Sequence, residues 1–480
     1  MLFNSLSFIL FLLFFLSIYW LIPKNRITIQ NLLLLFASYL FYSWWDWRFL
    51  SLIFLSTIVD FYIGILIYNS NNKRYRKSIL LLSIIFNLGL LAFFKYYNFF
   101  IESWAILLSN FGYNLSNKWT LSIILPVGIS FYTFQTMSYS LDIYFKKIKP
   151  TFNFIAYASF VSFSPQLIAG PIERAKNLIP QFMNSRSISL KEIKLGLRLI
   201  LWGLFKKVVI ADSLGFEADY IFNNYTILNG GVLLLGLAYF SFQIYCDFSG
   251  YSDIAIGISK LFGFELISNF NYPYFSKNIR EFWTRWHISL SSFFKDYLYF
   301  NLGGSKKSQM ITIRNILIVF LISGLWHGAK FTFIIWGLVH SIFYVCFFIT
   351  SSKKTSYYSS IREFLSTIIT YLCVMFAWVF FRANSFYEAI NYLFLLFNKF
   401  EFPKNHYQGL LFILIIVVFD WIHRNNSKDP LNYYTIFKIK NLSNSFLLTK
   451  ITYISIISTI FWFIVIYTFK NNNEFIYYQF

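Results

Sequence analysis

Apolar residues recur along this chain in runs of about 20 residues, the length that a membrane-spanning helix requires. Short segments rich in polar residues separate these runs. The pattern predicts an all-α, polytopic integral membrane protein with about 11–13 transmembrane helices, together with re-entrant or interfacial helices. The predicted spans are 2–22, 29–45, 49–68, 79–100, 121–144, 195–210, 230–246, 311–326, 331–349, 364–381, 409–422 and 451–469.

Nothing in the pattern divides the chain further. We find no internal repeat and no low-complexity linker, so residues 1–480 are predicted to form a single integral membrane domain. The run 154–169 is short and has polar ends, which favours a half-helix or a re-entrant piece. The first run, 2–22, has no basic segment before it and no small-residue cleavage site, so we interpret it as a span and not as a signal peptide.

Composition and charge agree with a membrane protein. The chain is 57% hydrophobic and only 13% charged, and its formal net charge is +21. The basic residues lie in short loops, where they set orientation and contact membrane lipids, so nucleic acid is not an expected partner. The positive-inside rule places the basic segment 73–77 and the stretches 145–194, 247–310 and 423–450 in the cytoplasm, and the acidic loop 211–229 outside. Three cysteines in or beside apolar runs show neither a disulfide framework nor a zinc motif.

His327 is the first candidate for chemistry. It lies in Ile322-Ser-Gly-Leu-Trp-His-Gly-Ala329, between two predicted spans. An ionisable side chain at membrane depth is costly and by default marks a functional site. Histidine titrates near neutral pH, which suits it to proton transfer. We predict that His327 is catalytic and that Trp326 supports it as an aromatic wall; a packed core histidine is the alternative.

A second histidine, His287, lies in a segment whose apolar residues follow helical spacing. These residues are Ile279, Phe282, Trp283, Trp286, Leu290, Phe293 and Phe294. The pattern predicts an amphipathic helix at the cytoplasmic interface, with His287 on its apolar side. Arg280 and Arg285 lie on the polar edge, where they can bind the phosphates of an anionic donor or lipid headgroups.

Asp247 is a further candidate, in the segment Tyr245-Cys-Asp-Phe-Ser-Gly-Tyr-Ser-Asp253. It stands at the end of a predicted span, where it can orient a histidine or a substrate hydroxyl. A helix-terminal cap is the alternative for Asp247. For Ser252 or Asp253, we interpret the residue as a cap before the next helix.

The segment 162–174 interrupts helical structure, because Pro165 and Pro171 cannot continue a helix and Gly170 permits unusual backbone angles. Irregular backbone at membrane depth occurs where it is buried in protein or lines a cavity. We predict that this segment lines a cavity; an ordinary loop is the alternative.

The remaining histidines and the common catalytic motifs add no site. The role of His340, on a predicted span, stays open, whereas His406 and His423 fall in predicted loops and are expected to be solvated. The chain contains no Walker phosphate loop, G-x-S-x-G elbow or H-E-x-x-H pair, and neither His287 nor His327 is followed by an acid five residues later. A serine nucleophile or a metal centre therefore has no local support.

Taken together, these segments resemble the membrane-bound O-acyltransferase family, in particular its bacterial alginate and polysaccharide O-acetyltransferase-like branch. They follow the family's order within a motif-bearing core at about 120–330. The matching segments are Leu125-Pro-Val-Gly-Ile-Ser-Phe-Tyr-Thr-Phe-Gln135, Pro165-Gln-Leu-Ile-Ala-Gly-Pro-Ile-Glu-Arg174, Tyr245-Cys-Asp-Phe-Ser-Gly-Tyr-Ser-Asp253, Arg285-Trp-His-Ile-Ser-Leu-Ser291 and Gly324-Leu-Trp-His-Gly-Ala329.

The resemblance implies a shell of helices around a central tunnel in the bacterial cytoplasmic (inner) membrane. It implies that His327 is the essential histidine and His287 the second one. An acetyl group would pass from acetyl-CoA, or another activated cytoplasmic donor, to a hydroxyl of an extracytoplasmic polysaccharide, with no permanently bound cofactor. A periplasmic SGNH-type acetyltransferase is the implied partner if the acetyl group is relayed.

Two other functions compete with this expectation. The same family includes a D-alanyl transferase, so D-alanyl or another acyl group is an alternative to acetyl. From a different class, a transporter or flippase of glycan precursors is also polytopic. Transporters tend to show repeated halves with broken helices at matching positions, and the two halves of this chain show no such symmetry.

Overall fold

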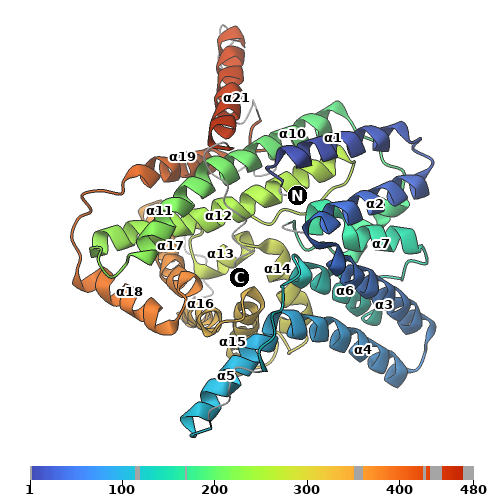
Figure 1. Cartoon of the computed structure of the whole chain (residues 1–480), viewed down its shortest axis with the longest axis horizontal. Helices are drawn as coiled ribbons and strands as arrows, with labels where there is room; N and C mark the ends of the chain where they lie inside the picture. Colours follow the sequence, from blue (N-terminus) through green and yellow to red (C-terminus); the bar gives the residue numbers. More distant parts are fainter. Residues whose placement is uncertain are drawn as a thin grey trace. The chain divides into compact units, whose positions relative to one another are not determined.

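Every regular element that the computed structural model describes is a helix (Figure 1). This confirms the all-α prediction. The contacts within the chain form two compact units, Met1–Ile193 with Ile258–Ile267 and Lys194–Gly257 with Ser268–Phe480. The single domain expected from the sequence stays a prediction, and each unit is treated by itself below. The described residues are 3–113, 119–167, 170–350, 360–424, 429–432 and 446–468.

The first unit is built from helices that precede residue 190. Helix α6 packs against α3 and α4, and α7 packs against α2, α3 and α9. The elements are α1 (Leu6–Leu21), α2 (Ile27–Asp46), η1 (Trp47–Phe49), α3 (Leu50–Asn69), α4 (Lys73–Leu91), η2 (Ala92–Tyr96), α5 (Tyr97–Asn110), α6 (Ile129–Tyr144), α7 (Phe154–Ser162), α8 (Ser164–Leu167) and α9 (Ala175–Met183).

A buried polar network joins α3, α4 and α6. The carboxylate of Asp60 accepts hydrogen bonds from Ser83 (2.5 Å), Ser140 (2.6 Å) and Asn87 (2.7 Å). All four side chains are fully buried. Polar side chains hold membrane helices together in this way, because hydrocarbon offers no other hydrogen-bond partner.

The second unit contains both candidate histidines and the later helices, apart from residues 190–193 and 258–261, which belong to the first unit. Helix α16 packs against α15 and α17, and α13 packs against α16 and α17. The elements are α10 (Leu190–Leu204), η4 (Phe205–Ala211), α11 (Asp212–Asn223), α12 (Gly230–Leu261), η5 (Pro273–Phe275), α13 (Ile279–Arg285), α14 (Ile288–Phe294), η6 (Lys295–Tyr299), α15 (Gln309–His327), α16 (Phe331–Thr350), α17 (Ser360–Arg382), α18 (Phe386–Asn398), α19 (Gln408–His423) and α21 (Phe446–Thr468).

Glycines allow α10 and α12 to approach closely. A side chain at Gly250 would lie 2.7 Å from the carbonyl oxygen of Gly203, and one at Gly257 would lie 2.6 Å from that of Gly196. Small residues at a helix interface are the usual means of close packing in membranes. Because the later glycine of one helix meets the earlier glycine of the other, the two helices run antiparallel at this contact.

Among the described residues, seven helical stretches are long and apolar enough to cross a membrane, which confirms a multi-pass protein. The number of separate stretches is smaller than the number of predicted spans. One reason is that α2 and α3, predicted as two spans, form one continuous stretch. Another is that the helices α1, α6 and α19, at three further predicted spans, have only 16 residues each. The seven are 27–69, 73–110, 230–261, 309–327, 331–350, 361–382 and 450–468.

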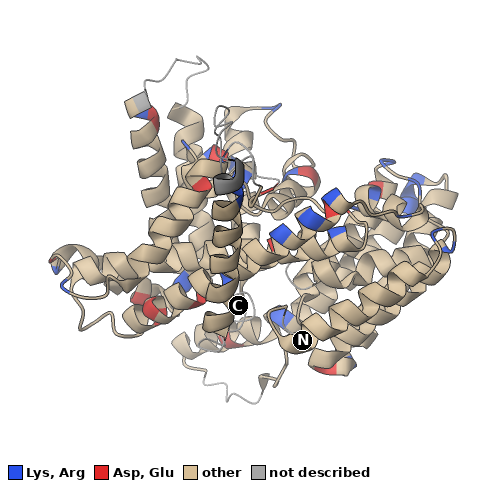
Figure 2. Ribbon diagram, turned by 90° about the horizontal axis from the view of Figure 1, so that it is seen from above, with Lys and Arg blue, Asp and Glu red and all other residues tan. Residues whose placement is uncertain are grey.

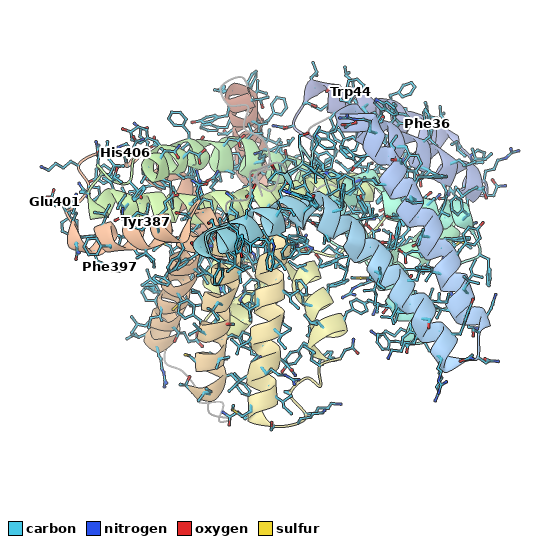
Figure 3. The ribbon with its side chains drawn as sticks, turned by 60° about the horizontal axis from the view of Figure 1, so that its bottom comes forward. Phe36, Trp44, Tyr387, Phe397, Glu401 and His406 are labelled. Carbon is cyan, nitrogen blue, oxygen red and sulfur yellow. The ribbon has the colours of Figure 1, made fainter. Side chains whose placement is uncertain are left out.

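The surface of the protein is apolar, as expected for helices that cross a membrane. Most of the ribbon in Figure 2 carries no charged side chain. Large aromatic side chains are exposed on several helices (Figure 3), including Phe36 and Trp44 of α2, each 61% exposed, and Tyr387 of α18, 78% exposed. Such exposure is costly in water but not in lipid, where apolar side chains meet hydrocarbon.

Two predicted boundaries differ from the structure. The span expected at 121–144 becomes helical only at Ile129, because Pro126 and the left-handed Gly128 (φ 74°) precede the helix. The run expected at 230–246 continues as α12 to Leu261, so the interpretation of Ser252 or Asp253 as the cap of a new helix is wrong.

The amphipathic segment and the loop histidines also differ from expectation. The single helix expected over 279–294 is two short helices, α13 and α14, broken at His287. The solvated loop position expected for His423 is wrong, because this residue ends α19 and is 1% exposed. His406 (Figure 3) is partly buried, and its Nδ1 lies 3.2 Å from Glu217.

Candidate active site

His327 is the last residue of α15, and Gly328 follows it as the C-cap. The turn into α16 is tight, because a side chain on Gly328 would collide with the ring of Phe333. His327 is buried, with an exposure of 3%. The rings of Trp326 and Trp336 lie with their centroids 5.0 Å from the imidazole centroid. The imidazole thus sits between aromatic walls from both helices.

His287 lies at the break between α13 and α14, where its backbone is left-handed (φ 42°). This conformation is uncommon for a residue other than glycine, and it persists only where the surroundings enforce it, often at a functional site. Asn269 supplies that support. Its main-chain carbonyl accepts the N–H of Ile288 (2.9 Å), and its Oδ1 accepts the N–H of Ser289 (3.3 Å).

The structure brings the two predicted histidines together. The ring centroids of His287 and His327 are 6.3 Å apart, and Trp326 lies 5.8 Å from His287. Phe248 of α12 packs edge-on against His287 at 4.7 Å. Burial lowers the pKa of His287 to about 3, so its imidazole is neutral at physiological pH.

A third histidine, His340 of α16, belongs to the same aromatic cluster. Trp336 contacts both His327 (5.0 Å) and His340 (4.8 Å). Trp283 of α13 lies 5.0 Å from the His340 ring, and His340 is fully buried. The sequence left the role of this histidine open. Its spacing of four residues from Trp336 on a helix was the signal that both share one face.

Asp247 lies inside α12 and forms an ion pair with Lys207, a residue that no sequence motif singles out. Lys207 Nζ lies 3.0 Å from Asp247 Oδ1 and 2.8 Å from Asp212 Oδ1. The three side chains are only 1–3% exposed. Lys207 belongs to η4, a π-helical segment of a kind that often occurs at functional sites. The available signal is the pair Lys206 and Lys207, two charged residues within the predicted span 195–210.

The contact between the Asp247 region and the histidines is made by Phe248, the next residue in the sequence. Phe248 packs on the ring of His287. The buried ion pair with Lys207 therefore fixes the part of α12 that forms one wall of the His287 site. Direct orientation of a histidine or of a substrate hydroxyl by Asp247 stays a prediction.

The two candidate arginines differ in their surroundings. Arg285 Nη2 donates to Glu281 Oε1 at 2.6 Å, and its Nη1 donates to the carbonyl of Asn271 at 3.4 Å. Arg280, on the same helix α13, is exposed. Arg285 is already paired with the carboxylate of Glu281, whereas Arg280 is exposed. Arg280 is therefore the more available of the two for binding a phosphate.

The proline-containing segment belongs to the first unit. Gln135 and Gln166 both donate to the carbonyl of Phe160, at 2.6 and 2.7 Å. Glu173 is 1% exposed and accepts a main-chain N–H at 2.6 Å; burial raises its pKa to about 7. Residues 168–169 lie outside the described residues. Cavity lining by this segment stays a prediction.

The arrangement in the second unit is suited to proton transfer. Two adjacent histidines lie among aromatic rings, and no group of three His, Cys, Asp or Glu side chains positioned to hold a metal ion occurs among the described residues. A neutral imidazole beside a hydroxyl is a general base that requires no further group. The geometry fits acyl transfer from an activated donor to a hydroxyl.

Comparison with known proteins identifies the family. The model of the membrane-bound O-acyltransferase family matches residues 39–387, which include both histidines. The chain belongs to the membrane-bound O-acyltransferase family. It is therefore an acyltransferase, and the expectation from the sequence motifs is confirmed.

Individual members of the family show where the chain stands within it. The probable alginate O-acetylase of Pseudomonas aeruginosa is 41% identical over 392 residues, covering 81% of this chain and 73% of that protein. The peptidoglycan O-acetyltransferase of Helicobacter pylori is 39% identical, covering 76% and 73%. The teichoic acid D-alanyltransferase of Bacillus subtilis is 29% identical, covering 56% of this chain and 71% of that protein.

Proposed function

We propose that this acyltransferase moves an acetyl group from a cytoplasmic donor to a hydroxyl of an extracytoplasmic polysaccharide. The main support is the adjacency of two buried histidines within a membrane acyltransferase. The names of the relatives support the acetyl group and a polymeric acceptor. Similarity to the D-alanyltransferase is weaker and covers less of this chain, so D-alanyl is the less favoured acyl group.

In this proposal His327 is the general base. A hydroxyl is a poor nucleophile until its proton is removed, whereas a thioester carbon is already activated. The imidazole of His327 takes the proton while the hydroxyl oxygen attacks the acyl carbon. Such proton transfer contributes about 10²–10⁴-fold to rate. His287 is neutral and lies beside His327, where it orients the reacting groups.

Acetyl-CoA is the proposed donor. Arg280, together with Arg285, which also pairs with Glu281, is proposed to bind its phosphates. The proposed location is the bacterial cytoplasmic membrane, with basic loops inside. The acceptor is either the glycan itself or a serine of a periplasmic SGNH-type acetyltransferase that passes the acetyl group on.

Substitution of His327 tests the proposal. Both His327→Ala and His327→Gln should insert and accumulate normally yet lose acetylation by about 100-fold or more, because neither side chain can accept the proton. His423→Gln is the matched control, since His423 is equally buried but stacks on Phe419 in α19. The readout is O-acetylation of cell-envelope glycan by mass spectrometry at matched expression. Wild-type acetylation in the glutamine variant would exclude His327 as the base.

A further inference from the structure

Two side-chain groups next to the left-handed turn at His287 take no part in holding that turn. Asn269 holds the left-handed turn with its main-chain carbonyl and with Oδ1. Its amide nitrogen Nδ2 makes no hydrogen bond within the described part of the chain. The same holds for the hydroxyl Oγ of Ser289, two residues after His287. Both residues are 0% exposed.

Fully buried donors without a partner are rare in native proteins, because each loses its hydrogen bonds to water on folding. Here two of them belong to residues that already touch, since Ser289 N–H donates to Asn269 Oδ1. His287 stands at the helix break and directly precedes the two anchored amides, and its ring lies 6.3 Å from that of His327. The unused donors therefore belong to the turn that presents His287.

We infer that Asn269 Nδ2 and Ser289 Oγ bind the carbonyl oxygen of the acyl donor and stabilise the negative charge that it develops during transfer. Side-chain amides and hydroxyls are among the groups that form oxyanion holes. Burial among aromatic side chains lowers the local dielectric constant and strengthens such hydrogen bonds. This inference rests on the proposed function and adds to it the residues that serve the acyl group.

The step balances as ordinary acyl transfer. The acceptor oxygen forms a bond to the carbonyl carbon of the thioester, and its proton passes to the His327 imidazole. The carbonyl π electrons move to the oxygen, which Asn269 and Ser289 hold as the oxyanion. When the double bond re-forms, the carbon–sulfur bond breaks and the departing thiolate takes the proton from His327.

Ser289→Ala is the sharpest test, because it removes only the hydroxyl and keeps every main-chain hydrogen bond of the turn. The control is Ser292→Ala on the same helix, whose hydroxyl is already used in a bond to the Ser289 carbonyl (2.9 Å). The assay follows thiol release from acetyl-CoA by purified protein in proteoliposomes, with a chito-oligosaccharide or water as acceptor. We expect Ser289→Ala to lower kcat about 100-fold, with the KM for acetyl-CoA little changed. Ser292→Ala should keep the wild-type kcat.

Asn269→Asp provides a second, chemically distinct measurement. The substitution keeps Oδ1, which supports the turn, and replaces the donor Nδ2 by an acceptor oxygen. Activity should fall at neutral pH and rise again as the pH is lowered, because a protonated carboxyl regains a donor. A purely structural role for Asn269 does not give this pH dependence.

The outcomes separate the two proposals. If wild-type protein is active and Ser289→Ala has the same kcat as Ser292→Ala, the oxyanion assignment is wrong while the proposed function stands. The assignment is also wrong if Asn269→Asp keeps wild-type activity at every pH. If wild-type protein releases no thiol from acetyl-CoA, the donor in the proposed function is wrong, and this inference fails with it.

Discussion

Replacement of Lys207 by methionine should destabilise the second unit more than any comparable change at the surface. Lys207 Nζ bridges two carboxylates, Asp212 at 2.8 Å and Asp247 at 3.0 Å, and these side chains are 1–3% exposed. Methionine has a similar length but no charge, so the substitution leaves two carboxylates buried close together. Burial, opposed by Lys207, already raises the pKa of Asp212 to about 7, and loss of the lysine removes that opposing effect.

The expected loss of stability follows from the burial of the three charged side chains. Removal of one partner from a buried ion pair costs about 3–5 kcal/mol, because the remaining charge is uncompensated. At about 2 °C per kcal/mol for a large domain, the midpoint of thermal unfolding in detergent should fall by about 6–10 °C. Lys260→Met is the matched control: its partner Glu265 is 79% exposed at 3.7 Å, and a surface pair contributes about 0–1 kcal/mol.

A triple variant tests the cause. Lys207→Met combined with Asp212→Asn and Asp247→Asn removes all three charges and keeps the side-chain volumes, so most of the lost stability should return. Unfolding of Lys207→Met at the same temperature as Lys260→Met would refute the argument from buried charge. A triple variant as unstable as Lys207→Met would show that packing around the lysine stem, and not charge, is the source of the effect.

Three further predictions follow from the site and the loops. His287→Ala should strongly reduce acetyl transfer while leaving some activity, since the imidazole orients but does not take the proton; full wild-type turnover would reduce His287 to a packing residue. Reporter fusions at 71–76 and 430–440 should report cytoplasm and fusions at 214–226 the outside; a cytoplasmic signal from 214–226 would overturn the orientation. Because the pKa of His287 is about 3 when folded against 6.5 as its reference, the unfolded state binds more protons between these values. Stability should therefore fall as the pH falls, by about 2 kcal/mol from pH 7 to pH 5, and His287→Asn should lack this contribution in unfolding measured at both pH values.

Periodicity and length predicted the helical, multi-pass architecture because they report directly on what surrounds each helix. A run of apolar residues must be buried in lipid or protein whatever its neighbours are. The boundaries were less predictable. Pro126 and Gly128 precede α6, which therefore begins later than the apolar run does. Nothing in the apolar pattern shows that α12 continues past Asp247, because a polar residue inside a long helix resembles a residue at the end of one.

The charged cluster could not be predicted from a single sequence. Lys207, Asp212 and Asp247 come from η4, α11 and α12, and their contact depends on how closely the glycines of α10 and α12 meet. Two lysines within an apolar run were evidence of buried charge, but the partners lie up to 40 residues away in sequence, Asp247 against Lys207. Burial of charge in such a run predicts that a partner exists without identifying it.

The burial of His287 was predicted correctly, although for a different physical reason from the one that the structure shows. Helical spacing placed it on an apolar face, whereas the chain breaks at this residue and turns left-handed. A left-handed residue with a Cβ carries a cost of about 1–2 kcal/mol that glycine avoids. His287→Gly should therefore relieve strain, while His287→Ala keeps it and His287→Asn suits the turn. If the imidazole is what matters, all three lose transfer alike; if the backbone position matters, the glycine variant should differ from the other two. The comparison thus separates the side chain from the turn that presents it.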